Sequence, residues 1–218
     1  METLPLFAEP APPLPAREEL AEGAVLLRGF ATAEETPLLA GLREILAAAP
    51  FRHLVTPGGL RMAVAMTNAG ARGWISDRRG YRYETRDPDS GRPWPALPPV
   101  FLRLAASAAA RAGYEGFVPD ACLINRYVAG TKLSLHQDRD ERDLVSPIVS
   151  VSLGLPAVFL FGGLQRKDPQ RRVPLAHGDV VVWGGASRLR FHGVLPLKAG
   201  HHSVLGEERI NLSFRKAA

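Results

Sequence analysis

Short apolar runs separated by Gly and Pro turns fill the second half of the chain. Runs of this length, often with apolar and polar residues alternating, are typical of β-strands rather than helices. Strands joined by such turns indicate a sandwich or jelly roll. We expect strands over residues 122–127, 132–136, 148–153, 157–161, 179–183, 191–195 and 209–214.

Two segments have the longer apolar period of a helix. The first should begin after Thr32, which is suited to an N-cap, and end near Ala49, with a strand over 23–30 before it. The second, Ala-rich helix should cover about 99–112 and end at Gly113, a favourable C-cap. The fold class expected is therefore mainly β with flanking helices.

The chain divides into stretches of different character. Residues 1–22 are rich in Pro and should form an extended or disordered leader. Residues 23–218 are long enough for one domain and short for two. Within this domain, 120–218 forms the β-rich core, whereas 51–99 is broken into loops and short hairpins and contains eight arginines.

Charge is unevenly distributed along the sequence. The chain has a net charge of +5, but the leader carries five Glu and one Arg. The remainder has 26 basic and 17 acidic side chains, a net charge of about +9. Arginine provides most of this charge and suits phosphates and carboxylates. A polyanionic partner is therefore plausible.

Features of secreted and membrane proteins are absent from the sequence. We expect no secretory signal, because no basic segment is followed by an apolar stretch and a cleavage site. No apolar run is long enough for a membrane helix, and Cys122 alone cannot form a disulfide within the chain. We expect a monomer in the reducing cytoplasm, with no membrane partner.

His136-Gln137-Asp138 is the first candidate for chemistry. On a strand, side chains two residues apart project to the same face with Cα atoms about 7 Å apart, so both could bind one ion. Two histidines and one carboxylate are the ligands of the facial triad that holds Fe(II). The motif alone is weak, because six histidines in 218 residues make a chance match common. A polar strand end is the competing explanation.

Four histidines compete for the third ligand position: His177, His192, His201 and His202. His177 precedes a Gly-Asp pair and looks like a turn residue. His192 lies in a strand-like run before Gly193, which permits close approach of another backbone. We favour His192.

The last predicted strand places Arg209, Asn211, Ser213 and Arg215 on one face, and apolar residues on the other. We expect a half-buried strand whose two inward guanidiniums need anionic partners, because burying an unpaired charge is costly. A dicarboxylate bound at the metal would satisfy both. An edge strand with solvated arginines is the alternative.

Asn125 and Tyr127 share a strand face in the same way. They could donate hydrogen bonds to a bound carboxylate, or pack in the core with a satisfied amide.

Several motifs together resemble the AlkB family of Fe(II)- and 2-oxoglutarate-dependent nucleic-acid dealkylating dioxygenases, in particular its bacterial founding member. The resemblance covers nearly all of the chain from Gly23. It rests on Asn125–Tyr127, His136–Glu141, Ile148–Gly154, His192 and Arg209–Arg215, with Met66-Thr67-Asn68 and Pro119–Asn125 in support.

This resemblance implies a double-stranded β-helix (jelly-roll) core and an N-terminal nucleotide-recognition lid over 51–99. It makes His136, Asp138 and His192 the iron ligands. It implies that O2 and 2-oxoglutarate are co-substrates, converted with loss of CO2 to succinate, and that the N-alkyl carbon leaves as formaldehyde. Residues around 2-oxoglutarate would be Asn125, Tyr127, Arg209, Asn211 and Arg215.

The resemblance also implies that the lid contacts an alkylated base in DNA, with RNA open as a second substrate. Bases methylated at adenine N1 or cytosine N3 are cationic, so aromatic faces and a carboxylate favour them over undamaged bases. The methyl group also blocks pairing, which lowers the cost of extruding the base. The implied contacts are Trp74, Tyr81, Tyr83, Asp140, Arg166 and Met66. Trp74, Tyr81 and Met66 could instead be packing residues, and Asp140 could cap a turn.

Two other functions compete with nucleic-acid dealkylation. The same iron chemistry could act on a protein or lipid, against which the basic, aromatic lid argues. A non-catalytic nucleic-acid-binding jelly-roll module would explain the arginines but would leave the His/Asp/His set as a coincidence.

Overall fold

The structure is a computed structural model, and it describes residues 16–218. The elements between the strands are the helices α1 (Glu35–Ala48) and α2 (Pro99–Arg111) and the short 3-10 helices η1 (Thr32–Glu34) and η2 (Gly185–Ser187). The strands are β1 (Arg17–Ala21), β2 (Ala24–Leu27), β3 (Ala65–Gly70), β4 (Gly73–Asp77), β5 (Gly80–Glu84), β6 (Ala121–Tyr127), β7 (Leu133–His136), β8 (Ile148–Gly154), β9 (Ala157–Phe161), β10 (Arg171–Leu175), β11 (Val180–Trp183), β12 (His192–Val194) and β13 (Arg209–Arg215).

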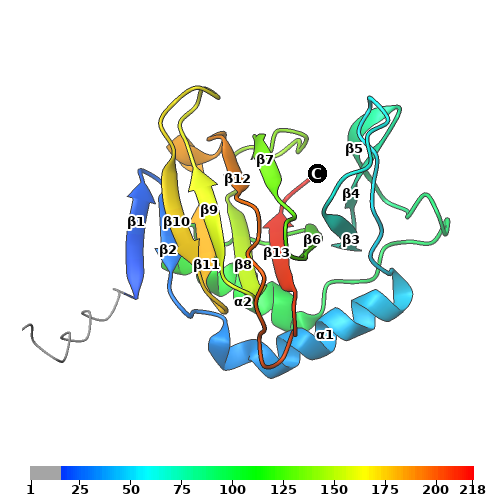
Figure 1. The fold of residues 1–218 in the computed structure, drawn as a ribbon, viewed down its shortest axis with the longest axis horizontal. Coiled ribbons are helices and arrows are strands. Elements are labelled where there is room, and N and C mark those ends of the chain that lie inside the picture. The colour runs from blue at the N-terminus through cyan, green and yellow to red at the C-terminus, as the bar shows by residue number, and fades with distance from the viewer. Residues whose placement is uncertain (1–15) are drawn as a thin grey trace, which may run out of the picture.

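Two antiparallel sheets face each other and form the core of the molecule (Figure 1). The larger sheet has seven strands in the order β1-β2-β11-β8-β13-β6-β3. The smaller sheet has four in the order β10-β9-β12-β7, and β4 and β5 form a separate hairpin. The mainly β fold with a jelly-roll core is therefore confirmed.

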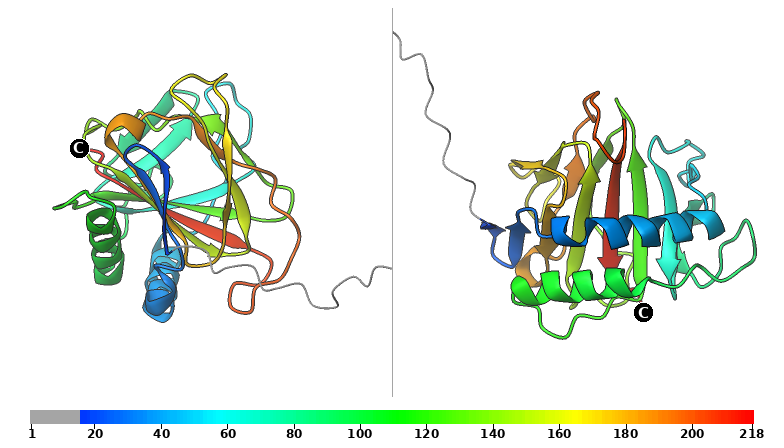
Figure 2. Two further views of the ribbon diagram at one scale, coloured as in Figure 1. Left: turned by 90° about the vertical axis from the view of Figure 1, so that its left-hand side faces the viewer. Right: turned by 90° about the horizontal axis from the view of Figure 1, so that it is seen from below.

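Both helices cover the outer face of the larger sheet, as Figure 2 shows from below. In α1, Leu38, Leu42 and Ile45 recur at the helical period and are buried against this sheet. In α2, Phe101 packs edge-to-face on Phe214 of β13, with ring centroids 5.7 Å apart. Each such buried aromatic side chain contributes roughly 2–3 kcal/mol through loss of contact with water.

The inner strand β13 is buried on both faces, not half-buried as the sequence suggested. Its apolar residues Ile210 and Leu212 face the helices, in the same core cluster as α1 and α2. Its polar residues are also buried, because the smaller sheet covers the other face. The alternation was predicted correctly, but the sequence did not show the second covering layer.

The N-terminal elements differ from the expectation in two places. Thr32 does not cap α1, because its hydroxyl donates to the carbonyl oxygen of Gly29 and a 3-10 turn precedes the helix. The expected leader ended at residue 22, but β1 begins at Arg17 and pairs with β2. Residues 1–15 of that leader lie outside the described residues.

The predicted strands correspond to β2, β6–β9 and β11–β13, whereas β10 was missed. The segment expected to form the lid also contributes to the core, because β3 pairs with β6 at the edge of the larger sheet. Between residues 16 and 218, no helix has both the length and the apolar character needed to cross a membrane.

Candidate metal and co-substrate site

His136 and His192 lie opposite each other on neighbouring strands of the smaller sheet. β7 and β12 pair so that the two residues are in register, with their ring centroids 4.3 Å apart. Gly193 makes this approach possible, since a Cβ at this position would lie 2.7 Å from the carbonyl oxygen of Leu133. Strand pairing thus brings two imidazoles together.

Asp138 completes the group from the loop that follows β7. Nε2 of His136 is 3.6 Å from its Oδ1, and Nε2 of His192 is 3.7 Å from its Oδ2. The candidate ligand atoms all lie within 4.8 Å of one another. The sequence placed His136 and Asp138 on one strand, but β7 ends at His136. Asp138 is instead held by Arg188, whose Nη1 donates to its backbone carbonyl at 2.7 Å.

Backbone carbonyl groups orient both imidazoles. Nδ1 of His136 lies 2.9 Å from the carbonyl oxygen of Ser134, and Nδ1 of His192 lies 3.1 Å from that of Arg190. A carbonyl only accepts, so each Nδ1 carries the proton and each Nε2 keeps its lone pair. Both lone pairs are therefore available to one ion, and the supporting bonds fix each tautomer.

The protonation states also suit a divalent cation. Burial opposes ionisation of Asp138, but Arg215, His192 and His136 hold the pKa of its carboxyl below the usual value. Burial lowers the pKa of His192 to about 4, with a further contribution from His136. One carboxylate and two imidazoles are the donor set of an open Fe(II) site.

The predicted co-substrate residues line neighbouring strands of the larger sheet. Arg209 pairs with Tyr127 and Asn211 with Asn125 in the register of β13 and β6. Nδ2 of Asn125 lies 3.4 Å from Oδ1 of Asn211. Arg215, at the far end of β13, donates from Nε and Nη2 to Oδ2 of Asp138 at 3.0 and 2.7 Å.

Arg209 has the properties of a buried anion-binding group. It is 1% exposed, lies over the ring of Tyr127, and donates from Nε to the hydroxyl of Ser152 at 3.0 Å. Within residues 16–218, its Nη1 and Oδ1 of Asn125 have no hydrogen-bond partner. A buried guanidinium nitrogen without an acceptor is costly, so Arg209 fits a carboxylate ligand.

The hairpin β4–β5 brings the predicted base contacts to the loop that contains Asp138. Trp74 and Tyr81 stack with ring centroids 5.6 Å apart and planes 13° apart. Nε1 of Trp74 donates to Oδ2 of Asp140 at 2.8 Å, and the hydroxyl of Tyr83 donates to Glu141 at 2.6 Å. Four of the six predicted substrate residues are therefore in this assembly.

The other two predicted contacts lie elsewhere. Arg166 is exposed beside β7, where it donates to the carbonyl oxygen of Leu135 at 2.7 Å and stacks on Phe191. Met66 is 4% exposed and belongs to the core between the two sheets. The packing alternative thus agrees with the surroundings of Met66, and its contact with a substrate stays a prediction.

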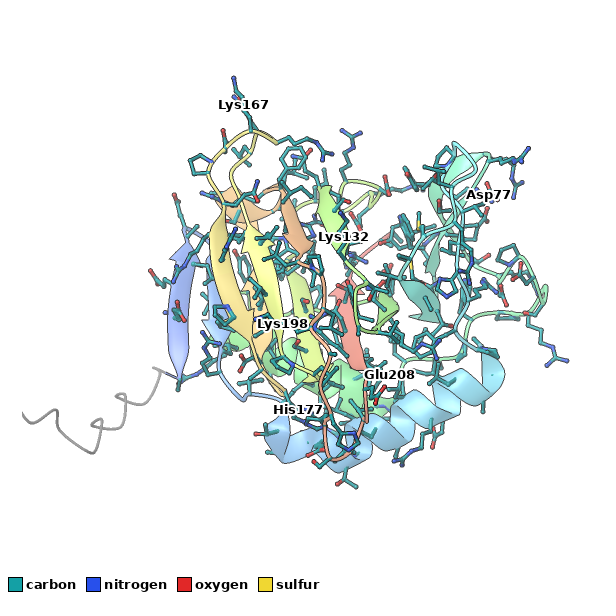
Figure 3. The ribbon with its side chains drawn as sticks, in the orientation of Figure 1. Asp77, Lys132, Lys167, His177, Lys198 and Glu208 are labelled. Atoms are coloured by element: carbon teal, nitrogen blue, oxygen red, sulfur yellow. The ribbon has the colours of Figure 1, made fainter. Side chains whose placement is uncertain are left out.

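The remaining candidate histidines lie away from the metal ligands. His177 is in a turn, as expected, and stacks on His202 with ring centroids 4.5 Å apart. Its Nε2 is 3.8 Å from Oε2 of Glu35 in α1. Figure 3 shows His177 close to this helix. Its Nδ1 accepts the backbone N–H of Gly154 at 2.9 Å. His201 is exposed.

Two charged residues of the site were missed by the sequence analysis. Glu141 and Arg188 are 6% and 3% exposed, and their side chains form an ion pair at 3.2 Å. The one available signal was closeness in sequence to the predicted metal ligands. Glu141 lies three residues after Asp138, and Arg188 lies four residues before His192. Burial of a charged residue depends on tertiary contacts that no local pattern reports.

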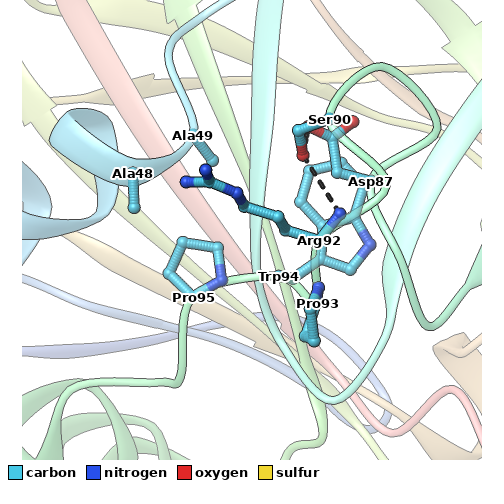
Figure 4. A pocket seen from close by; sticks show the side chains of 8 residues that line it. All are labelled: Ala48, Ala49, Asp87, Ser90, Arg92, Pro93, Trp94 and Pro95. Atoms are coloured by element: carbon cyan, nitrogen blue, oxygen red, sulfur yellow. Dashed lines mark hydrogen bonds between the residues drawn. The ribbon is translucent and has the colours of Figure 1, made fainter.

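Two small surface hollows lie outside this group. One of about 90 Å3 is lined by Asp87, Arg92 and Trp94 among others, next to the end of α1 (Figure 4). Another of about 160 Å3 lies between α1 and the segment before β13. Neither is lined by a candidate ligand or co-substrate residue.

Comparisons with known proteins agree with this geometry. The family model described as 2OG-Fe(II) oxygenase superfamily matches residues 23–215. The chain is 59% identical over 215 residues to the alpha-ketoglutarate-dependent dioxygenase AlkB of Salmonella typhimurium, covering 99% of this chain and 98% of that protein. It is 56% identical to the Escherichia coli protein of the same name, with 98% of each covered. The solved structure of OsALKBH1 superposes with a TM-score of 0.80 at 29% identity, over 92% of this chain and 99% of that chain.

Proposed function

Because this chain belongs to the AlkB family within the 2OG-Fe(II) oxygenase superfamily, we propose that it is a dioxygenase that removes alkyl groups from nucleic-acid bases. The observation that carries the proposal is the convergence of His136, Asp138 and His192 beside two buried arginines. A non-catalytic module would not need this arrangement.

We assign Fe(II) to His136, Asp138 and His192. The acid 2-oxoglutarate would be held by Arg209, Arg215 and Asn211 of β13 and by Asn125 and Tyr127 of β6, which pairs with it. When bound, iron and 2-oxoglutarate supply the oxidation, in which O2 is consumed, the acid becomes succinate and CO2, and the N-alkyl carbon is hydroxylated.

The residues of the chain bind and orient the reactants. Arg209 can neutralise a carboxylate with its unpaired Nη1, in a site where Tyr127 and the sheet exclude water. Arg215 keeps Asp138 ionised and fixes its orientation through two hydrogen bonds. A hydroxylated N-methyl group then leaves as formaldehyde without a further residue, because the hemiaminal breaks down to the N–H base and the aldehyde.

The hairpin provides a surface for a cationic base. The ring of Trp74 is fixed by Asp140 and lies parallel to Tyr81, which is 48% exposed. Aromatic faces and a carboxylate attract the positive charge of 1-methyladenine or 3-methylcytosine. We therefore propose these two bases in DNA as substrates, contacted by Trp74 and the Tyr81 to Tyr83 segment, with Asp140 and Arg166 bordering the pocket.

Exposed basic side chains lie on two loops of the molecule. Figure 3 shows Asp77 on the β4–β5 hairpin and Lys167 at the tip of the loop between β9 and β10. Arg78 and Arg79 next to Asp77, and Arg166 next to Lys167, are exposed. Such groups suit phosphates on either side of an extruded base.

A panel of singly methylated DNA and RNA oligonucleotides tests the proposal. We expect Fe(II)-dependent loss of one methyl group from 1-methyladenine and 3-methylcytosine, with stoichiometric succinate and formaldehyde. Asp138→Ala should abolish iron binding and product while the far-ultraviolet circular dichroism is retained. Unchanged oligonucleotides together with continued 2-oxoglutarate consumption would show that the enzyme oxidises another class of substrate.

Size-exclusion chromatography and cell fractionation test our further proposal of a cytoplasmic monomer.

A further inference from the structure

One buried carboxylate joins three separate parts of the molecule. Glu141 accepts the hydroxyl of Tyr83 from the hairpin at 2.6 Å and lies 3.3 Å from Nε of Arg215 on β13, both through Oε1. Its Oε2 accepts Nη2 of Arg188, which follows η2, at 3.2 Å. The hairpin, the larger sheet and the 3-10 segment therefore meet at one side chain.

Two routes lead from Glu141 to the metal ligand Asp138. Arg215 contacts both carboxylates, and binds Oδ2 of Asp138 with two nitrogens. Arg188 contacts Glu141 and also donates to the backbone carbonyl of Asp138 at 2.7 Å and that of Ser146 at 3.1 Å. Two guanidiniums and two carboxylates balance in charge, so a change at one member alters the others.

We propose that Glu141 is a positioning residue that couples the position of the β4–β5 hairpin to the arrangement of Asp138 and Arg215. The inference rests on the proposed function, in which the hairpin binds the nucleotide and Arg215 binds the co-substrate. When the hairpin carries Tyr83 away, Oε1 of Glu141 loses one donor and Arg215 redistributes between the two carboxylates.

The adjacent contact of the hairpin has a different character. Trp74 donates to Asp140, which is exposed, so water can replace that bond when the hairpin moves. Glu141 is buried, so water replaces the Tyr83 bond less readily. The coupling should therefore pass through Tyr83 and Glu141 rather than through Trp74 and Asp140.

Thermodynamic linkage gives the coupling a measurable form. If an occupied hairpin favours the arrangement of Arg215 that binds the acid, then a methylated base tightens 2-oxoglutarate binding. The acid tightens binding of the base by the same factor. Removing the link should bring that factor towards one.

The first measurement uses metal-free protein and needs no substrate. Hydrogen exchange is compared among wild type, Glu141→Gln, Tyr83→Phe and two matched controls. Tyr114→Phe removes a phenol hydrogen bond to Gly23 outside the site, and Glu18→Gln removes a carboxylate charge between Arg28 and Arg171. We expect hydrogen exchange in residues 73–84 and 138–146 to be several-fold faster in Glu141→Gln and Tyr83→Phe than in the wild type. In the two controls, exchange in both segments should match the wild type.

The second measurement determines the 2-oxoglutarate affinity of Fe(II)-loaded protein without oxygen, with and without a 1-methyladenine oligonucleotide. We expect the oligonucleotide to tighten binding in the wild type by about fivefold or more, and by less than about twofold in Tyr83→Phe and Glu141→Gln. Both controls should keep the wild-type factor.

Two results would overturn the coupling. One is unchanged exchange in residues 73–84 of Glu141→Gln, which would make Glu141 a local support of its own loop. The other is a wild-type coupling factor in Tyr83→Phe. Failure of the proposed function gives a different result. The oligonucleotide would then leave the 2-oxoglutarate affinity unchanged in the wild type and in every variant, and the hydrogen exchange of residues 73–84 and 138–146 would still test the coupling.

Discussion

At the scale of single residues, hydrogen bonds and charges prepare the site before any ligand binds. Carbonyl groups fix the tautomers of His136 and His192, and Arg215 keeps Asp138 ionised. The ligand residues could be predicted from the sequence once the family resemblance was added, because the His-Gln-Asp motif by itself is common by chance. The supporting role of Glu141 could not, because it arises only from contacts between distant segments.

Replacing Arg215 tests how much its guanidinium group contributes to the free energy of unfolding. Arg215→Met leaves Asp138 and Glu141 buried without their shared cation, so metal-free protein should lose about 3–5 kcal/mol in urea unfolding. Arg215→Lys should recover only part of this loss, because an ammonium cannot reproduce the three contacts of the guanidinium.

Arg171→Met is the matched control for that loss. Its ion pair with Glu18 is 44% exposed on the arginine side, so the cost should stay below about 1 kcal/mol. Equal losses for Arg215→Met and Arg171→Met would show that the buried network does not stabilise the fold.

His177 predicts a dependence of stability on pH. Burial, and then repulsion from His202, lowers the pKa of His177, although Glu35 acts in the opposite direction. Below pH about 6.5 the unfolded chain takes up a proton that the folded imidazole resists. The free energy of unfolding should therefore fall as pH decreases from 7 towards 5.

His177→Asn should flatten this part of the curve, measured by urea unfolding at a series of pH values. The folded imidazole cannot accept a proton at Nδ1 without losing the backbone N–H of Gly154. The exposed His201→Asn variant is the control and should follow the wild-type curve. A parallel shift of the whole curve in His177→Asn, with its slope retained, would contradict the assignment.

At the scale of elements, periodicity predicted most strands but not their environment. Alternation over 209–215 correctly separated the two faces of β13, yet both faces are buried because layers cover each side. β10 was missed because its sequence, Arg-Arg-Val-Pro-Leu, has a proline and two arginines, which an edge strand tolerates. β1 was missed because it follows a Pro-rich stretch and pairs through Glu-rich residues.

The pairing of β7 with β12 makes Gly193 a test of the metal site. In Gly193→Ala, the new Cβ would lie 2.7 Å from the carbonyl oxygen of Leu133 and 3.2 Å from the nitrogen of Leu135. The strands must separate, at a cost of about 1–3 kcal/mol, which moves His192 away from His136. Titration with Fe(II) without oxygen should show metal affinity at least about tenfold weaker.

Gly58→Ala provides the comparison, since its nearest neighbour to an added Cβ is the Thr56 hydroxyl at 3.8 Å. This variant should bind metal as the wild type does. Wild-type metal affinity in Gly193→Ala would mean that close pairing of the two strands does not position the ligands.

At the scale of the whole molecule, charge should separate recognition of nucleic acid from the oxidation itself. Exposed arginines and Lys167 lie on the hairpin and on the loop between β9 and β10. Between 50 and 200 mM salt, kcat/KM for a methylated oligonucleotide should fall at least about tenfold. Consumption of 2-oxoglutarate without a nucleic acid should change much less, because Arg209 and Arg215 are buried. Equal salt dependence of both reactions would argue against phosphate contacts.

The strand β13 has a consequence for the range of acids that the enzyme accepts. Arg209 and Arg215 begin and end this strand, so their Cα atoms are about 20 Å apart along a rigid backbone that pairs on both sides. The strand therefore fixes the separation of the two arginines. No single side-chain substitution can shorten it, so in the proposed co-substrate site a longer or shorter keto acid would have to be accommodated by the arginine side chains alone.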